Sequence, residues 1–144
     1  MLLVLKIKVS CERYIFSGRA MKRRKIPYFT VLLVIFAIAI FYLSSYPMPR
    51  KRPHIPFLDK IVHFAAFSVF YILTYGALRE NGVRKKLFLW AFLIGALYGA
   101  VIEIYQYFVP YRECSLWDWL ADISGEVFAA LVVQKSAFRK IITS

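Results

Sequence analysis

Four long apolar stretches alternate with short polar and charged connections along the chain. Each stretch has roughly the ~20 residues that an α-helix needs to cross the apolar interior of a bilayer. The pattern therefore predicts four helices, over Tyr28–Ser45, Ile61–Leu78, Leu87–Val109 and about Leu116–Val133. The third stretch is the clearest of the four. Three acids interrupt the fourth stretch, so an amphipathic or re-entrant helix is the alternative to a crossing there.

The composition favours a membrane protein over a soluble domain. Apolar residues make up 60% of the 144 residues and aromatic residues 18%, and the connections are too short for a separate soluble domain. We therefore expect an all-α integral membrane bundle of four transmembrane helices within residues 21–144. Residues 1–20 precede Met21, which is followed by a charged flank and an apolar run. We interpret this lead as a start-site artefact, or otherwise as an amphipathic cytoplasmic segment.

The net charge of +12 raises the question of nucleic-acid binding. The basic residues, however, gather between the apolar stretches, at residues 21–25, 49–53 and 84–86, and not along one binding face. Clusters next to membrane-spanning segments are typical of anchoring to anionic lipid head groups. We therefore expect membrane lipids as partners and no nucleic acid.

The distribution of basic residues also predicts the orientation. Fifteen of the 20 lysines and arginines lie in the N-terminal tail, the second connection and the C-terminal tail. The other five lie in the first and third connections. The positive-inside rule then places the N- and C-termini in the cytoplasm and the first and third connections outside. Cys11 and Cys114 lie on opposite sides in this topology, so they cannot pair within one chain, and we expect both to be structurally neutral.

This topology brings most of the ionisable residues to one level of the membrane. Asp59 begins the second crossing at its outer end, Glu103 lies near the outer end of the third, and Asp118 opens the fourth. His63 lies one helical turn below Asp59, and Arg112 lies in the outer third connection. Because the topology rests on basic residues alone, this convergence independently supports a polar site at the outer leaflet.

Helical spacing indicates which way these side chains point. Two pairs share a helix face because four residues separate their members: Asp59 with His63, and Asp118 with Asp122. Gly95, Gly99 and Glu103 also follow one another at intervals of four. A Gly-x-x-x-Gly face lets a neighbouring helix approach closely, so Glu103 is predicted to point into the bundle. An unpaired charge deep in the bilayer costs ~3 kcal/mol, and Arg112 and a protonated His63 are the expected partners that lower this cost.

Several of these residues also have a purely structural interpretation. Asp59 and His63 can be a helix cap and a core histidine, and Asp118 can be the N-cap of the fourth helix. Glu126 lies a turn deeper than Asp122, and we expect it to be protonated and hydrogen-bonded between helices. We expect Glu113 to be a solvated loop acid. The aromatic side chains near the outer connections are expected to form an interfacial belt of Tyr105, Tyr107, Tyr111, Trp117 and Trp119.

Two segments, DKIVHF at 59–64 and EIYQYFVPYRECSLWDWLADISG at 103–125, resemble the VanZ-like membrane proteins. The shared pattern is acid-Lys-x-x-His-Phe, then Glu-x-x-Gln, a Pro-x-Arg turn, Ser-x-x-Asp, and an Asn three residues before Gly. Asp122 stands where the family commonly has that Asn. The resemblance covers about residues 57–131 and implies a small bundle of several crossings in the bacterial cytoplasmic membrane. The founding member is linked to resistance to teicoplanin-type lipoglycopeptides, and the family name implies no reaction.

One function that fits is an enzyme acting on a lipid-linked or cell-wall substrate at the outer leaflet and affecting teicoplanin susceptibility. Its candidate catalytic acids and bases are Glu103, Asp118, His63 and Asp59. Its candidate substrate-binding residues are Arg112, Lys60, Gln106, Ser115 and Asp122. The two basic side chains among them can hold a phosphate or a carboxylate. A divalent metal held by the acids and the histidine is a further option.

The alternative is non-catalytic binding of a lipid tail or of a lipophilic drug such as a lipoglycopeptide. In that function the acids orient and pack the helices, and the aromatic belt grips the ligand. A proton- or ion-coupled transporter is a third option, for which a chain of four short crossings would need to form a homo-oligomer.

Overall fold

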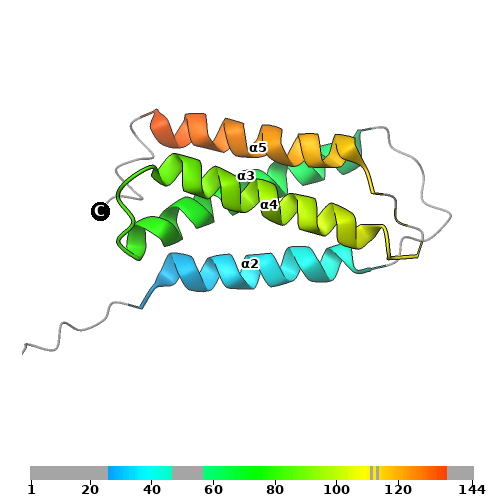
Figure 1. Cartoon of the computed structure of the whole chain (residues 1–144), viewed down its shortest axis with the longest axis horizontal. Coiled ribbons are helices and arrows are strands. Elements are labelled where there is room, and N and C mark those ends of the chain that lie inside the picture. Colours follow the sequence, from blue (N-terminus) through cyan, green and yellow to red (C-terminus); the bar gives the residue numbers. More distant parts are fainter. Residues whose placement is uncertain (1–25, 47–56, 111, 113, 136–144) are drawn as a thin grey trace, which may run out of the picture.

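The computed structural model describes residues 26–46, 57–110, 112 and 114–135. This part of the chain contains four α-helices and no strand: α2 (Tyr28–Ser44), α3 (Leu58–Glu80), α4 (Leu87–Gln106) and α5 (Leu116–Gln134). The helices lie side by side along the long axis of the molecule, and successive helices run in opposite directions (Figure 1). The prediction of an all-helical fold with four helices is therefore confirmed over the described residues.

The helix boundaries differ from those predicted by one or two residues at three ends and by three residues at two ends, the beginning of α3 and the end of α4. Helix α3 begins at Leu58, three residues before the expected start, so that Asp59 lies in its first turn. A carboxylate there interacts favourably with the free N–H groups and the positive end of the helix dipole. Helix α4 ends at Gln106 and not at Val109. Pro110 explains the early end because the residue before a proline is disfavoured in helical conformation, and Val109 instead closes a turn onto the carbonyl of Gln106.

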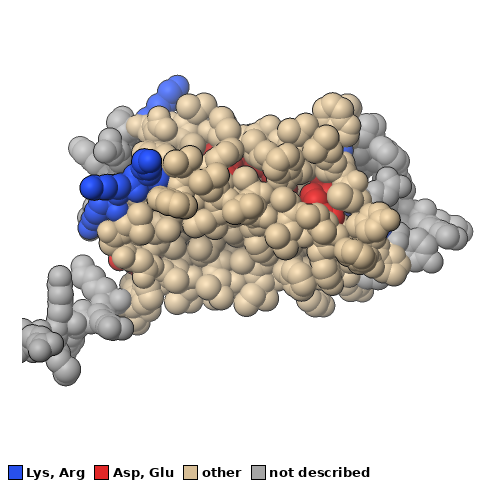
Figure 2. All heavy atoms as spheres, viewed as in Figure 1, with Lys and Arg blue, Asp and Glu red and all other residues tan. Residues whose placement is uncertain are grey.

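Two of the four helices, α3 and α4, are long and apolar enough to cross a membrane. Helix α2 is apolar but only 17 residues long, and α5 carries three acids. On the face drawn in Figure 2 the middle of the bundle carries few charged side chains, and most of the visible Lys and Arg gather at one end. Large apolar side chains such as Ile38, Leu97 and Val101 are exposed, whereas acids such as Glu103 and Asp122 are buried. This distribution is the reverse of that of a soluble helical bundle and is typical of helices that face lipid.

Helix α3 packs against each of the other three helices, and its longest interface is with α5. The apolar core lies where the C-terminal halves of α3 and α5 meet the beginning of α4, and consists of Tyr71, Tyr75, Leu87, Ala91, Ala129 and Val133. The buried acids Glu103, Asp118 and Asp122 lie in the opposite half of the bundle, and Glu126 lies between the two halves. Apolar packing thus holds one half together, while the other half carries the ionisable groups.

Helices α3 and α5 approach each other closely at Gly125. A Cβ atom there would meet the backbone carbonyl of Phe64, so α5 can lie against α3 only with glycine at this position. The hydroxyl of Ser68 uses the short distance to donate to the Gly125 carbonyl at 3.0 Å. At Gly95 and Gly99 neighbouring helices also come close, but with side chains and not with backbone: the carboxylates of Glu126 and Asp122 occupy the space that a Cβ atom would need.

Candidate functional site

The beginning of α3, the end of α4 and the beginning of α5 meet at one end of the bundle because successive helices run in opposite directions (Figure 1). These three helix ends place six of the predicted site residues together, and we refer to this set as the polar cluster: Asp59, Lys60, His63, Glu103, Asp118 and Asp122. The predicted convergence of residues distant in sequence is therefore confirmed. The side of a membrane on which the polar cluster lies stays a prediction.

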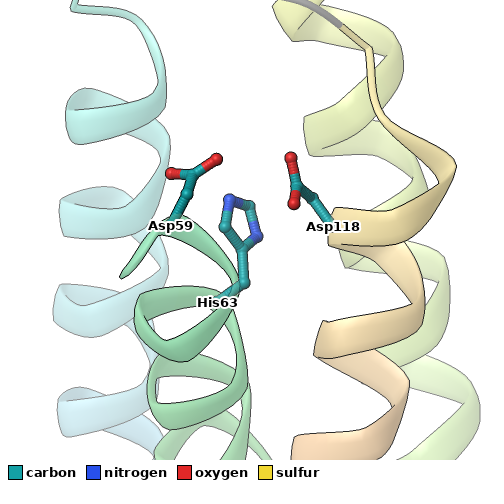
Figure 3. Close-up of side chains that lie close together, drawn as sticks. All are labelled: Asp59, His63 and Asp118. Atoms are coloured by element: carbon teal, nitrogen blue, oxygen red, sulfur yellow. The ribbon is translucent and has the colours of Figure 1, made fainter. Parts of the chain in front are cut away.

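His63 is the centre of the polar cluster. Its Nδ1 lies 2.9 Å from Oδ1 of Asp122 and 3.9 Å from Oε1 of Glu103, so the ring joins α3 to both α4 and α5. The His63 ring lies between the carboxylates of Asp59 and Asp118 (Figure 3). The prediction that Glu103 points into the bundle is confirmed, since only 3% of its surface is exposed.

Lys60 lies at the rim of the polar cluster and makes a cross-helix ion pair. Its Nζ is 2.9 Å from Oδ1 of Asp118, which is almost fully buried, whereas the lysine side chain is 38% exposed. The structural alternative for Asp118 is wrong, because Ser115 is the N-cap of α5. The hydroxyl of Ser115 accepts a hydrogen bond from the Asp118 backbone N–H at 3.4 Å. Asp118 occupies the first turn of α5, which leaves its carboxylate free to reach Lys60.

Glu103 connects the end of α4 to the beginning of α5. Its Oε2 accepts a hydrogen bond from the backbone N–H of Ser115 at 2.9 Å. Its Oε1 is buried and accepts no hydrogen bond from the described residues, and the same holds for Oδ2 of Asp122. Buried polar atoms are almost always hydrogen-bonded in proteins, so two unpaired carboxylate oxygens in one cluster mark a place for a cationic partner.

Two sets of three residues bring potential metal ligands within 4.8 Å of one another: Asp59, His63 and Asp118, and His63, Glu103 and Asp122. The two sets share His63. The second set is the more enclosed, because Glu103 and Asp122 are buried whereas Asp59 is exposed. One imidazole nitrogen with two carboxylate oxygens is a ligand set used by divalent transition metals.

Arg112 lies away from the acids. Its guanidinium donates hydrogen bonds to the backbone carbonyls of Leu43 at 3.0 Å and of Tyr46 at 3.4 Å, at the C-terminal end of α2. It makes no ion pair with an acid among the described residues, so the prediction that Arg112 compensates the acids is wrong there. The carbonyls at the end of α2 lack partners within their own helix and carry the negative end of its dipole, which attracts the guanidinium.

Two further predicted residues lie on the inner face of α4 and α5. Gln106 is buried at the end of α4, close to one turn beyond Glu103. Glu126 is fully buried below Asp122, beside Gly95. Neither of its carboxylate oxygens has a hydrogen-bond partner among the described residues. The prediction of a hydrogen bond between helices is therefore wrong for Glu126, because the facing position on α4 is a glycine that offers no polar side chain.

The remaining predictions concern aromatic and loop residues. Tyr107 and Trp117 are exposed at the polar end, as expected of an interfacial belt. Trp119 differs, since its indole N–H donates to the backbone carbonyl of Ala96 on α4 at 3.0 Å. Cys114 is a free, exposed thiol. Three residues of the predictions lie outside the described residues: Cys11, Tyr111 and Glu113.

Sequence reasoning found every member of the polar cluster but not the pairing within it. Helical spacing pairs Asp59 with His63 and Asp118 with Asp122, whereas the observed contacts run between helices. Lys60 contacts Asp118, and His63 contacts Asp122. The charge signs and the alternating helix directions are the signals from which these cross-helix pairs can be anticipated.

The apolar exterior, the two helices able to span a bilayer and the polar cluster at one end define a helical membrane protein with a buried ionisable site. The family model of VanZ/LLP1 matches residues 9–139, and the chain belongs to this family. The resemblance seen in the two sequence segments is therefore confirmed. Comparison with curated proteins and with solved structures gave no match.

Proposed function

We propose that this protein crosses the bacterial cytoplasmic membrane four times, with both termini in the cytoplasm, and acts on a lipid-linked envelope substrate at the outer face. The polar cluster is the site of action, and the consequence for the cell is a change in susceptibility to teicoplanin-type lipoglycopeptides. Family membership and the position of the polar cluster at a single end of the bundle support this proposal.

The contact between His63 and Asp122 is the observation that carries the proposal. A buried carboxylate that accepts from one ring nitrogen fixes the orientation of the imidazole, as in known acid–base pairs. The other ring nitrogen points toward the space between Asp59 and Asp118 (Figure 3). His63 is thereby placed to give or take a proton at the end of the bundle, with Asp122 as its positioning residue.

Lys60 is the group that would meet an anionic head group. Its ammonium lies at the rim and is partly exposed, while its partner Asp118 is buried behind it. A flexible lysine at a rim can contact phosphate or carboxylate while it keeps one hydrogen bond to its own acid. The head group would then lie over the polar cluster, and the lipid tail would lie along the apolar exterior.

The test compares the wild type, Glu103→Gln and Glu126→Gln, matched for membrane abundance, in a teicoplanin-sensitive Gram-positive host. Both substitutions remove one buried carboxylate, but only Glu103 belongs to the polar cluster. We expect the wild type and Glu126→Gln to raise the minimal inhibitory concentration of teicoplanin, with vancomycin as the comparison drug, and Glu103→Gln to have no such effect. Absence of tolerance from all three proteins would contradict the proposed cellular role.

Non-catalytic binding of a lipid or lipophilic drug is the second candidate. The observation that favours it is the group of aromatic side chains at the polar end, since Tyr107, Phe108 and Trp117 are each at least 70% exposed. Exposed aromatic side chains next to a polar site can hold an acyl chain or a lipoglycopeptide tail. Equal tolerance from the wild type and Glu103→Gln, lost on Trp117→Ala, would favour this function over an acid–base site.

A further inference from the structure

We propose that His63, Glu103 and Asp122 bind a divalent transition-metal ion where α3, α4 and α5 meet. Each helix contributes one ligand, and one donor atom from each residue lies within 4.8 Å of the other two. The ion therefore joins three helices at the end of the bundle that holds the polar cluster. The apolar core lies in the opposite half and does not hold these helix ends together.

The distances between the donor atoms suit such an ion. Ligand atoms placed ~2.1 Å from a tetrahedral metal lie about 3.4 Å from one another. Nδ1 of His63 is 2.9 Å from Oδ1 of Asp122, which is shorter than this separation. It is 3.9 Å from Oε1 of Glu103, which is longer. The donor atoms of Glu103 and Asp122 lie within 4.8 Å of each other, so all three atoms are close enough for side-chain rotation to bring them around one ion.

Two of the three proposed ligands also carry buried oxygens without a hydrogen bond. Oε1 of Glu103, which faces His63, and Oδ2 of Asp122 are buried without a hydrogen bond from the described chain. Asp122 is fully buried and Glu103 is 3% exposed, so water does not readily replace the missing partners. A Cβ atom at position 99 would lie only 2.9 Å from Oδ2 of Asp122, so Gly99 provides the room around this oxygen.

The residues around the three ligands fit this role. The backbone N–H of Ser115 holds Oε2 of Glu103 and directs Oε1 toward the ring, as outer hydrogen bonds do at metal sites. The polar cluster contains four carboxylates and one lysine, and that lysine pairs with Asp118. Glu103 and Asp122 thus face no lysine or arginine among the described residues and share one histidine, His63, so a divalent cation would offset both charges.

The ligand set decides which ions fit. Imidazole suits Zn²⁺ and carboxylates suit Mn²⁺, so one imidazole with two carboxylates can hold either ion, whereas Mg²⁺ and Ca²⁺ prefer oxygen ligands alone. Three protein ligands leave a coordination position open, which is a property of catalytic metal sites. If the proposed function holds, the open position would take an anionic oxygen of the lipid-linked substrate, and this part of the inference rests on that function. Because Nδ1 of His63 cannot both ligate the ion and donate a hydrogen bond to Asp122, the bound ion would replace that hydrogen bond and take over from His63 as the group that acts on the substrate.

The test is a titration of Mn²⁺ into the full-length, chelator-stripped protein in detergent, with free Mn²⁺ followed by electron paramagnetic resonance. We expect one Mn²⁺ per chain, displaced by Zn²⁺ and not by equimolar Mg²⁺. Glu103→Gln should weaken binding by at least about tenfold, because loss of a ligand costs no less than loss of an outer hydrogen bond. Glu126→Gln, a buried acid outside the ligand set, should bind as the wild type does.

A second measurement separates ligation from misfolding. Nitrogen modulation in the electron spin echo of bound Mn²⁺ should be present in the wild type and absent in His63→Gln, with both proteins eluting as the same species. No binding of Mn²⁺ or Zn²⁺ at millimolar concentration, or equal affinity in the wild type and Glu103→Gln, would overturn the proposal. If the protein binds metal but its expression does not change teicoplanin susceptibility, the metal site is supported and the proposed function is contradicted.

Discussion

Glu103 shows how one side chain can serve both the fold and the site. Its two carboxylate oxygens have different surroundings: Oε2 accepts from the Ser115 backbone N–H, and Oε1 faces His63. The first contact closes the connection between α4 and α5, because it binds an N–H group that precedes the first turn of α5. The second places a buried oxygen beside a titratable ring. Structural and chemical roles of Glu103 can therefore be separated by substitution.

Glu103→Gln and Glu103→Ala should differ in stability although both lose the charge. The glutamine keeps an oxygen that accepts from Ser115, whereas alanine leaves that buried N–H unpaired, at a cost of about 1–3 kcal/mol. We expect the midpoint of thermal unfolding in detergent to fall clearly for the alanine variant and to stay near the wild-type value for the glutamine variant. Equal losses for both variants would mean that the Ser115 contact is not what stabilises this end.

Helix α2 depends on the other helices for both of its ends. Pro27 at its N-terminus provides no side-chain cap, and none of its residues except Ser44 is buried. Instead Glu80, from the end of α3, accepts hydrogen bonds from the backbone N–H and hydroxyl of Thr30 at 3.1 and 3.3 Å. Arg112 donates to the carbonyls at the other end. An acid at the N-terminal end of a helix and a base at its C-terminal end both interact favourably with the helix dipole.

Arg112→Gln should loosen the C-terminal end of α2. The loss of a positive charge beside unpaired carbonyls is expected to lower stability by about 0.5–1 kcal/mol. Hydrogen exchange, followed by mass spectrometry in detergent, should become faster in the last turn of α2 and remain unchanged in α5. Arg84→Gln, in the connection between α3 and α4, is the matched control. Unchanged exchange together with lost teicoplanin tolerance would assign Arg112 to substrate binding and not to the cap.

At the scale of the whole molecule, the described charges are separated along the bundle. The polar cluster occupies one end, and the basic residues at the end of α3, in the next connection and after α5 occupy the other (Figure 2). These basic residues are Arg79, Arg84, Lys85, Lys86 and Lys135. The bundle between the two ends is apolar on its outside. This arrangement is the one that the positive-inside rule favours when the polar cluster faces outward.

Cys114 provides a direct test of that orientation, because it is exposed just before α5 at the polar end. With Cys11 changed to Ser, a membrane-impermeant maleimide should label Cys114 in intact cells. A second protein, with Cys114→Ser and Lys85→Cys in addition, should be labelled only after the cells are permeabilised. The reverse pattern would place the polar cluster in the cytoplasm and exclude action at the outer leaflet.

Much of the architecture follows from short-range properties of the chain. The length and apolarity of each stretch predict four helices, because every backbone polar group must be paired inside a membrane and a helix does this within one segment. Alternating helix directions then bring Asp59, Glu103 and Asp118 to one end whatever the details of packing. The membership of the polar cluster was for this reason predictable from residue types and positions.

The contacts within the polar cluster depend on the tertiary structure. Whether His63 meets Asp59 or Asp122 is decided by the rotation of α3 against α5, which in turn follows from the close packing of Gly125 on the backbone of Phe64. Arg112 reaches α2 and not the acids because the carbonyls at the end of that helix carry the negative end of its dipole and can accept from the guanidinium. Sequence periodicity fixes the face of one helix at a time. Helix packing sets the distances between helices. These distances, together with the lengths of the side chains, decide which charged groups remain without a partner.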